Sequence, residues 1–285
     1  VIDTGIDYNH PDLAANMWLN AGEIPGDGID NDGNGYIDDI YGIDAHNNDS
    51  DPFDDHYHGT HCAGTIGAVG NNGVGVAGVC WNVKLMALKF LSSSGSGYTS
   101  NAIACIQYAI DNGAHIMSNS WGGGGYSQAL YDSIASARDA GLLFIAAAGN
   151  SGSNNDSYPH YPSSYTVDNV IAVAATDKND SLASFSCYGA ASVDVAAPGV
   201  SIYSTKPNNT YGSLSGTSMA TPHVAGLAAL IKSYQPQLNW SQIKTKIFDT
   251  VDPIAALNGK MTTGGRINAA FAITSVAPPT IAITN

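Results

Sequence analysis

Apolar residues follow two alternating patterns along this chain. Short continuous apolar runs, typical of strands buried on both faces, occupy residues 1–7, 84–91, 116–118, 142–148, 170–175 and 193–196. Apolar residues at helical spacing occupy residues 58–69, 100–112 and 130–140, a long segment that begins near residue 218, and the shorter stretches 240–249 and 268–273. Such strands in alternation with helices predict an α/β fold, with helices on both faces of a mostly parallel sheet.

Two segments follow neither pattern. Residues 23–55 are rich in Gly, Asp and Asn and predict long ordered loops. Residues 276–280, Val-Ala-Pro-Pro-Thr, have the composition of a linker. We therefore expect one domain over residues 1–275 and a linker or tail at 276–285. No apolar run approaches the ~20 residues of a membrane-spanning helix, so no membrane span is expected.

The chain is strongly acidic, with a formal net charge of −14 from 24 acidic and 10 basic residues. A phosphate backbone would be repelled, which argues against nucleic-acid binding. An acidic surface often serves solubility alone. Here, however, Asp and Asn concentrate between residues 27 and 55, and this clustering favours the binding of cations.

Four cysteines are present, and no two of them have the Cys-x-x-Cys spacing of zinc or thioredoxin-like sites. We expect a free thiol at Cys62, which lies within a motif of small residues. A disulfide among Cys80, Cys105 and Cys187 stays open, because sequence alone does not give the pairing.

Three motifs contain the residue types of a nucleophilic triad. Ser218 stands where the turn Gly216-Thr217 meets an apolar helix, so that free N–H groups and the helix dipole favour negative charge beside it. A lone serine at such a position is usually an N-cap. Asp3 in Val-Ile-Asp-Thr-Gly and His58 in His-Gly-Thr-His-Cys-Ala-Gly change this interpretation, because the order Asp, His, Ser is a known order of the Ser-His-Asp triad.

Together with Ala-Ala-Ala-Gly-Asn at residues 146–150, these motifs resemble the subtilisin-like serine proteases (subtilases) from residue 1 to about residue 272. The resemblance implies a three-layer fold, with a mostly parallel central sheet and helices on both faces. It also implies a serine endopeptidase, with Ser218 as nucleophile, His58 as general acid and base, and Asp3 as the carboxylate that orients the imidazole.

The same resemblance assigns the remaining catalytic and histidine roles. Asn150 and the backbone N–H of Ser218 are implied as donors to the oxyanion of the tetrahedral intermediate. His61 is expected to be structural, hydrogen-bonded to the backbone, and His223 is expected in the core. We expect the other histidines at the surface or in loops: His10, His46, His56 and His115.

Two glycine-bearing segments resemble the edges between which subtilases clamp a substrate as an added β-strand. They comprise Gly95, Ser96 and Gly97, and Ser120, Trp121 and Gly122. The resemblance implies that Ala148 and Gly149 help to wall the pocket for the substrate residue before the cleaved bond (P1). His160 falls at the floor of this pocket, where many relatives have a small residue. We expect a broad specificity with large apolar P1 side chains, since no acidic residue favours a basic one.

Residues 30–39 begin like the calcium loop of an EF-hand, with oxygen donors at loop positions 1, 3, 5, 7 and 9 and Gly at position 6. The terminal Glu of that loop is absent, and Asp39 is a substitute for it. The candidate ligands are Asp30, Asp32, Asn34, Tyr36, Asp38 and Asp39. The alternative is a solvated acidic loop.

Two further calcium sites are implied by the resemblance to subtilases alone. One uses Asp12 with the side chain of Asn72 and the carbonyl groups of Val74 and Val76. The other resembles an additional loop site of some family members and uses Asp44, Asn47, Asp49 and either Asp51 or Asp54. One to three structural Ca²⁺ ions are therefore expected, which stabilise loops and take no part in acyl transfer.

Residue 1 falls inside the strand that carries Asp3, so we expect that an upstream region precedes it in the whole protein. The resemblance implies a signal peptide and a prodomain that aids folding and inhibits the enzyme. It also implies secretion, protein or peptide substrates, and a monomer.

Two other functions stay open. An esterase or peptide ligase would use the same acyl-enzyme chemistry. A catalytically silent calcium-binding or adhesion module would use only the fold, because a fold does not guarantee an activity.

Overall fold

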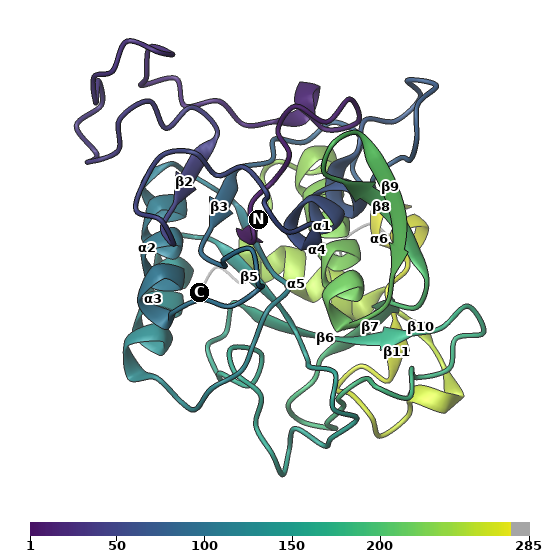
Figure 1. Cartoon of the computed structure of the whole chain (residues 1–285). Coiled ribbons are helices and arrows are strands. Elements are labelled where there is room, and N and C mark those ends of the chain that lie inside the picture. Colours follow the sequence, from purple (N-terminus) through teal and green to yellow (C-terminus); the bar gives the residue numbers. More distant parts are fainter. Residues whose placement is uncertain (275–285) are drawn as a thin grey trace, which may run out of the picture.

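A mostly parallel sheet runs through the middle of the protein (Figure 1). The computed structural model describes residues 1–274. The parallel strands are β1 (Ile2–Asp3), β2 (Gly42–Asp44), β3 (Ala87–Lys89), β4 (Ile116–Asn119), β5 (Leu143–Ala147), β6 (Val170–Thr176) and β7 (Val195–Pro198). They form one group in the order β2-β3-β1 and a second in the order β4-β5-β6-β7. The two groups continue one another because β1 contacts β4.

Two short strands extend the sheet beyond β7. Strand β11 (Gly265–Arg266) pairs parallel with β7, and β10 (Asp252–Pro253) pairs antiparallel with β11. All ladders between β1 and β7 are parallel, so their carboxyl ends lie along one edge of the sheet, where open α/β sheets bind their ligands.

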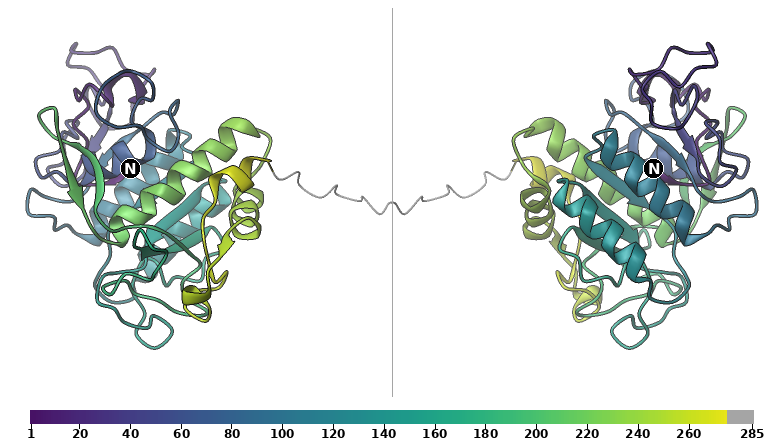
Figure 2. Two further views of the ribbon diagram at one scale, coloured as in Figure 1. Left: turned by 90° about the vertical axis from the view of Figure 1, so that its right-hand side faces the viewer. Right: turned by 90° about the vertical axis from the view of Figure 1, so that its left-hand side faces the viewer.

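Helices cover both faces of the sheet, as the sequence predicts (Figure 2). One face carries α2 (Thr99–Asp111) and α3 (Gln128–Asp139). The other carries α1 (His58–Gly67), α4 (Thr217–Tyr234), α5 (Trp240–Asp249) and α6 (Ala269–Thr274). The predicted three-layer α/β fold is therefore confirmed.

Strand β5 shows why the strands are apolar throughout. Leu143 and Ile145 belong to the core beneath α4, whereas Phe144 and Ala146 belong to the core beneath α2 and α3. Side chains of a strand alternate between the two faces of a sheet, and here both faces are covered. The apolar pattern is therefore continuous, without the alternation of a strand that has one wet face.

Several elements have other bounds than the pattern predicts, or were not predicted. The strands expected at 1–7 and 84–91 are limited to β1 and β3, and the helix expected at 58–69 ends at Gly67. Strand β2 lies within the segment expected as loop. The hairpin of β8 (Ile202–Lys206) and β9 (Thr210–Leu214) was missed, although Asn208 and Asn209, with φ of 63° and 55°, provide a favourable hairpin turn. Two 3₁₀ helices complete the list, η1 (Ala14–Asn16) and η2 (Ala255–Leu257).

Within residues 1–274, none of the helices combines the length and the apolar character required to cross a bilayer. The expected linker or tail at residues 276–285 lies outside the described residues.

Helix α1 packs directly on the turn that follows β1. A Cβ added to Gly59 would lie 2.1 Å from the carbonyl oxygen of Gly5, so no side chain fits between the two backbones. We predict that Gly59→Ala lowers the free energy of unfolding by about 1–3 kcal/mol, because the added methyl group forces α1 away from β1. Denaturant unfolding of the variant measures this change.

Gly125→Ala is the matched control, since a Cβ at Gly125 meets nothing within 4 Å. Its free energy of unfolding should stay within about 0.5 kcal/mol of the unsubstituted protein. Equal stability of the two variants would show that the contact between Gly59 and Gly5 is not a tight one.

Candidate active site

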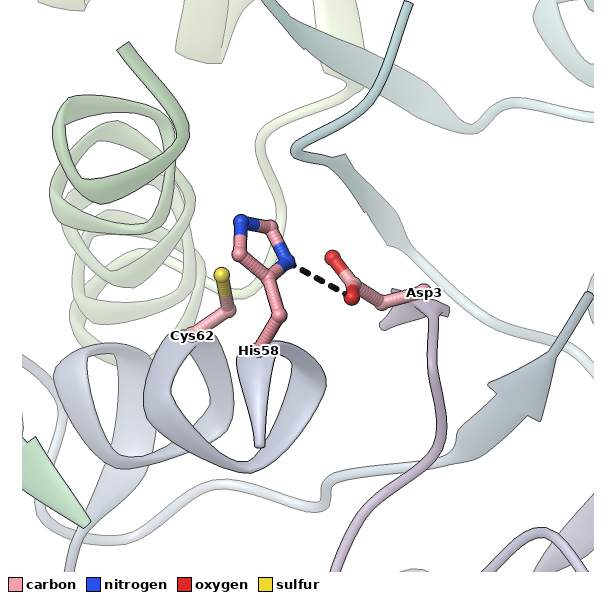
Figure 3. A group of neighbouring side chains, drawn as sticks. All are labelled: Asp3, His58 and Cys62. Carbon is pink, nitrogen blue, oxygen red and sulfur yellow. Dashed lines mark hydrogen bonds and ion pairs between the residues drawn. The ribbon is translucent and has the colours of Figure 1, made fainter. Parts of the chain in front are cut away.

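Asp3 and His58 meet at the carboxyl end of β1 and the first residue of α1 (Figure 3). The Nδ1 atom of His58 lies 2.8 Å from Oδ1 of Asp3, in hydrogen-bonding distance. Asp3 is fully buried, and the same oxygen accepts a 2.7 Å hydrogen bond from the backbone N–H of Thr4. The imidazole is thus held by one ring nitrogen, and its other nitrogen is left for chemistry.

Asp54 holds the start of α1 against β1. Its carboxylate accepts hydrogen bonds from the backbone N–H of Thr60 at 2.9 Å, the Thr60 hydroxyl at 2.6 Å and the Thr4 hydroxyl at 2.9 Å. Thr4 in turn accepts a bond from the backbone N–H of Gly59 at 2.9 Å. The oxygens of Asp54, the alternative ligand of the third predicted calcium site, thus fasten the helix that begins at His58.

Two opposing effects act on the imidazole of His58. Burial disfavours the imidazolium, but the negative charge of Asp3, its hydrogen bond and the charge of Asp54 outweigh burial. The pKa of His58 is therefore raised above its ordinary value.

Ser218 lies in the first turn of α4 and forms two hydrogen bonds with Ser120. The Ser218 hydroxyl donates to the carbonyl oxygen of Ser120 at 3.0 Å, and the Ser120 hydroxyl donates to the carbonyl oxygen of Ser218 at 2.9 Å. Ser120 and His58 line the same cleft. In this arrangement the Ser218 hydroxyl is turned toward Ser120, and within residues 1–274 it forms no hydrogen bond with His58.

Asn150 lies beyond the end of β5 and is hydrogen-bonded to the start of α4. Its Oδ1 atom accepts bonds from the backbone N–H of Thr217 at 2.8 Å and from the Thr217 hydroxyl at 3.0 Å. A Cβ added to Gly216 would lie 3.4 Å from its Nδ2 atom, so the amide donor is held beside the residue that precedes Thr217. The sequence motifs did not single out Thr217, which is fully buried and fixes this orientation.

The two predicted substrate segments line one cleft of about 520 Å³. Its lining includes all of Gly95–Gly97 and Ser120–Gly122 together with His58. The Trp121 ring packs edge-on against Phe90, with 4.8 Å between ring centroids, which fixes one wall.

His160 lies between Gly122 of the second substrate segment and Gly149 of the predicted P1 wall. A Cβ added to Gly122 would lie 2.2 Å from its Cε1 atom, and one added to Gly149 would lie 2.9 Å from its Cδ2 atom. The ring therefore spans the gap between these segments. Its Nδ1 atom lies 3.3 Å from the hydroxyl of Ser163, and burial lowers the pKa of His160.

The other histidines mostly match expectation. His61 is fully buried, and its Nε2 atom lies 3.0 Å from the carbonyl oxygen of Ile202 and 3.1 Å from that of Gly212. His223 is partly buried, with Nδ1 2.8 Å from the carbonyl oxygen of Met219. His10 lies in a loop, as expected, but it is 1% exposed, and its Nε2 atom lies 3.3 Å from the carbonyl oxygen of Thr210 in the β8–β9 hairpin.

All four cysteines are buried free thiols, which answers the question of pairing. Cys62 lies one helical turn after His58 on α1, and its Sγ atom lies 3.5 Å from the carbonyl oxygen of Ser218 (Figure 3). Burial raises the pKa of the Cys62 thiol well above its usual value, so it remains protonated beside the catalytic candidates.

Two of the predicted loop ligands, Asp32 and Asp39, meet a third carboxylate, that of Glu23, with ligand atoms within 4.8 Å of one another. Glu23 and Asp39 are buried, and the Tyr108 hydroxyl donates to Asp39 at 2.5 Å. Such a set of hard oxygen donors suits Ca²⁺. Glu23 was missed because it lies outside the EF-hand-like pattern, and only folding of the loop brings it in.

Other predicted ligands of this loop form hydrogen bonds within the loop itself. Asp30 accepts a bond from the backbone N–H of Gly35 at 2.9 Å, and Asp38 accepts one from that of Gly26 at 2.7 Å. Asn34 donates its side-chain amide to Asp39 at 2.8 Å. The structure therefore places Asp30 and Asp38 outside the carboxylate group, whereas Asn34 borders it.

The residues of the second predicted calcium site also lie together. Fully buried Asp12 accepts bonds from the Asn72 amide at 2.8 Å, the Val76 N–H at 2.9 Å and the Tyr211 hydroxyl at 3.0 Å. The Val74 N–H donates to the Asn72 side-chain oxygen at 3.0 Å. N–H groups face Asp12 here, where the resemblance implies ligating carbonyl oxygens.

The carboxylates of the third predicted calcium site do not point to one common position. Asp44 accepts bonds from the backbone and side-chain nitrogens of Asn47 at 3.0 and 2.9 Å, while Asp51 accepts a bond from the Tyr8 hydroxyl at 2.9 Å. Asp49 accepts one from the backbone N–H of Asp51 at 3.0 Å. In the described part of the chain these carboxylates do not meet in a group of three.

The fold and the Asp–His pair at the carboxyl edge of its sheet are those of a subtilase. The subtilase family model matches residues 1–272, and the chain belongs to this family. It is 43% identical to thermitase of Thermoactinomyces vulgaris over 273 residues, which cover 96% of this chain and 87% of that protein. It is 44% identical to subtilisin DY of Bacillus licheniformis over 251 residues, which cover 88% and 81%.

A longer relative is subtilisin-like protease 1 of Plasmodium vivax, which is 40% identical over 286 residues. The alignment covers 94% of this chain and 45% of that protein, so the chain spans less than half of the length of this relative.

The burial of His61 makes stability depend on pH. Its pKa is lowered from 6.5 to about 4 by burial, so the unfolded chain binds more protons between these values. The stabilisation is complete above pH 6.5 and is lost as the pH falls toward 4. We predict that His61→Gln removes roughly 3 kcal/mol of this pH dependence.

Denaturant unfolding of both proteins at about pH 7.5 and about pH 4.5, in a Ser218→Ala background that prevents self-digestion, measures the effect. An equal loss of stability in both proteins on acidification would contradict the role given to His61.

Proposed function

We propose that this chain is the catalytic domain of a calcium-stabilised serine endopeptidase of the subtilase family. The observation that carries the proposal is the 2.8 Å contact between Asp3 and His58, since His58 lines a cleft together with Ser120, the hydrogen-bond partner of Ser218. Membership of the family supports the same activity.

In the proposed reaction, His58 takes the proton of the Ser218 hydroxyl through Nε2 while Ser218 attacks the scissile carbonyl carbon. Asp3 holds the imidazole in the required tautomer. The leaving amine then receives this proton, and water hydrolyses the acyl-enzyme by the reverse steps. A rotation about the Cα–Cβ bond of Ser218 turns its hydroxyl from Ser120 toward His58, and contacts of this kind often tighten only with substrate bound.

The oxyanion is assigned to the side-chain amide of Asn150 and the backbone N–H of Ser218. Two observations support the assignment: Thr217 engages the oxygen of Asn150, which leaves the amide nitrogen as donor, and Ser218 lies in the first turn of α4. Unpaired N–H groups and the positive end of the helix dipole favour negative charge at that position.

The substrate is proposed to bind as an extended strand between Gly95–Gly97 and Ser120–Gly122, with an apolar P1 side chain. The ring of His160 occupies space between Gly122 and Gly149, so we now propose small rather than large apolar P1 residues. Mapping the cleavage sites in a denatured protein tests this proposal: a majority of Phe or Leu before the cleaved bond would contradict it.

The resemblance to subtilases also supports a secreted, monomeric enzyme whose own prodomain assists folding and inhibits it. Size-exclusion chromatography with light scattering tests the monomer. Expression with and without the upstream coding region tests the prodomain, since a chain that folds unaided would contradict its role.

Ser218 is the proposed nucleophile. A serine-directed sulfonyl fluoride should label Ser218 alone, and Ser218→Ala should lower the hydrolysis of casein by at least about 10⁴-fold. Mass spectrometry of the labelled peptide and a casein assay make these measurements. The matched control is Ser215→Ala, which replaces a hydroxyl near the same helix that accepts a 2.8 Å hydrogen bond from the backbone N–H of Ser201.

Failure of Ser218 to react in the folded protein would exclude the triad and favour the silent module. Turnover of esters without turnover of casein would favour the esterase.

The calcium site with the strongest support is the group Glu23, Asp32 and Asp39, because three carboxylates within 4.8 Å repel one another unless a cation lies between them. The ion would hold the 23–55 loop and would supply no step of the reaction. The sites at Asp12 and Asp44 remain part of the proposal, for a total of one to three ions.

We predict that chelation by EGTA lowers the free energy of unfolding by about 4 kcal/mol relative to Ca²⁺ at a thousand times its dissociation constant. Glu23→Gln should remove most of the Ca²⁺-dependent difference that its site contributes, whereas Asp111→Asn, which changes an exposed carboxylate on α2, should keep it. Thermal unfolding with and without Ca²⁺ measures the difference, and calorimetric titration gives the number of ions. Stability that does not depend on Ca²⁺ would exclude all three sites.

A further inference from the structure

Lys89 is a buried charged residue that the proposed reaction does not use. It ends β3, the central strand of the β2-β3-β1 group, and its side chain is 2% exposed. The sequence places it in the apolar run 84–91, where a charged residue is unusual. Burial of an ammonium group costs several kcal/mol unless hydrogen bonds and an opposite charge compensate, so its presence there needs a physical explanation.

Three acceptors surround the ammonium nitrogen. Nζ donates to the carbonyl oxygen of Thr4 at 2.9 Å, the carbonyl oxygen of Leu91 at 2.8 Å and Oδ1 of Asp55 at 2.7 Å. An ammonium group has three N–H donors, and each of them has a partner here. The carboxylate of Asp55 is half exposed, so water also reaches this end of the contact.

Two of these acceptors flank the backbone of Asp3. Thr4 follows Asp3 in the chain, and its N–H donates to the Asp3 carboxylate at 2.7 Å. The N–H groups of Phe90 and Leu91 donate to the Asp3 carbonyl oxygen at 3.0 and 3.2 Å. Asp3 and Lys89 are also register partners in the β1–β3 ladder. The hydrogen bonds of the ammonium group to Thr4 and Leu91 therefore lie on both sides of the Asp3 backbone.

The third acceptor, Asp55, lies on the side of His58. Asp55 lies in the segment that leads into His58, next to Asp54, whose carboxylate fastens the first turn of α1. Lys89 therefore bonds at once to the strand that carries Asp3 and to the segment that presents His58.

We propose that Lys89 is a positioning residue for the Asp3–His58 hydrogen bond. The proposal rests on the triad of the proposed function and adds to it a buried cation that fixes the distance between the carboxylate and the imidazole. Without the ammonium group, the Thr4 and Leu91 carbonyl oxygens lose a shared donor, and the Asp3 carboxylate gains freedom to rotate away from His58. Substrate binding uses other surfaces of the cleft, so the effect falls on the chemical step.

Lys89→Met tests this, because methionine keeps the length of the side chain and removes its donors and charge. We expect kcat to fall about tenfold to a hundredfold, the range of a small misplacement of catalytic groups, while KM changes less than about twofold. In the ¹H NMR spectrum, the low-field resonance of the His58 Nδ1 proton should shift or broaden, because it reports the hydrogen bond to Asp3 directly.

Lys244→Met is the matched control. Lys244 also donates to two backbone carbonyl oxygens, those of Asp168 and Val170 at 2.8 and 2.7 Å, but it ties α5 to the start of β6, away from the triad. The Lys244→Met variant should be less stable than the unsubstituted protein but should keep its kcat and its His58 Nδ1 proton resonance. Asp55→Asn keeps an acceptor oxygen for Nζ and the two carbonyl bonds of Lys89 but removes the negative charge, so its fall in kcat should be smaller than that of Lys89→Met.

An unchanged kcat and resonance in folded Lys89→Met would overturn the proposal, and so would equal losses of kcat in the two lysine variants. If Lys89→Met does not fold, Lys89→Gln, which retains an amide donor, should give an intermediate fall in kcat, and full activity of that variant would overturn the proposal. If the unsubstituted protein neither cleaves casein nor reacts at Ser218, the proposed function fails, and the His58 resonance in the two lysine variants still decides whether Lys89 holds the pair.

Discussion

The contact between Asp3 and His58 sets the constraint on which this end of the molecule depends. It joins residues 55 positions apart, one at the end of a strand and one at the start of a helix. A 2.8 Å contact of this kind tolerates little change in the separation of β1 and α1. The backbones therefore meet at Gly5 and Gly59, where no side chain fits between them.

Polar bonds, more than apolar packing, fix the geometry around this contact. Asp54 and Lys89 are buried beside the pair, and each has hydrogen bonds to both the β1 side and the α1 side of it. Hydrogen bonds have narrow ranges of distance and angle, whereas apolar contacts are not directional. A buried polar network can thus orient the Asp3 carboxylate and the His58 imidazole, which the apolar sheet beneath them cannot do on its own.

The acidic loops pose the opposite problem. They carry much of the net charge of −14, and Glu23, Asp32 and Asp39 bring like charges within a few ångströms of one another. Hydrogen bonds from Asn and Tyr side chains offset part of this repulsion, and a divalent cation would offset the rest. These carboxylates are not among the residues that line the cleft with His58, so a cation bound by them would lie outside that cleft.

The sequence by itself determined the α/β class and the two-faced core, because apolar runs such as 142–148 and 170–175 alternate with helical segments that cover both of their faces. The family followed from the sequence motifs. Its motifs also pointed to Asp3, His58 and Ser218, since motif residues are adjacent in the chain. Only the tertiary structure decided which distant groups join them. Glu23 reaches Asp32 and Asp39, and Lys89 reaches Asp55, through contacts that no local pattern encodes, because both depend on how loops and strands far apart in sequence pack together.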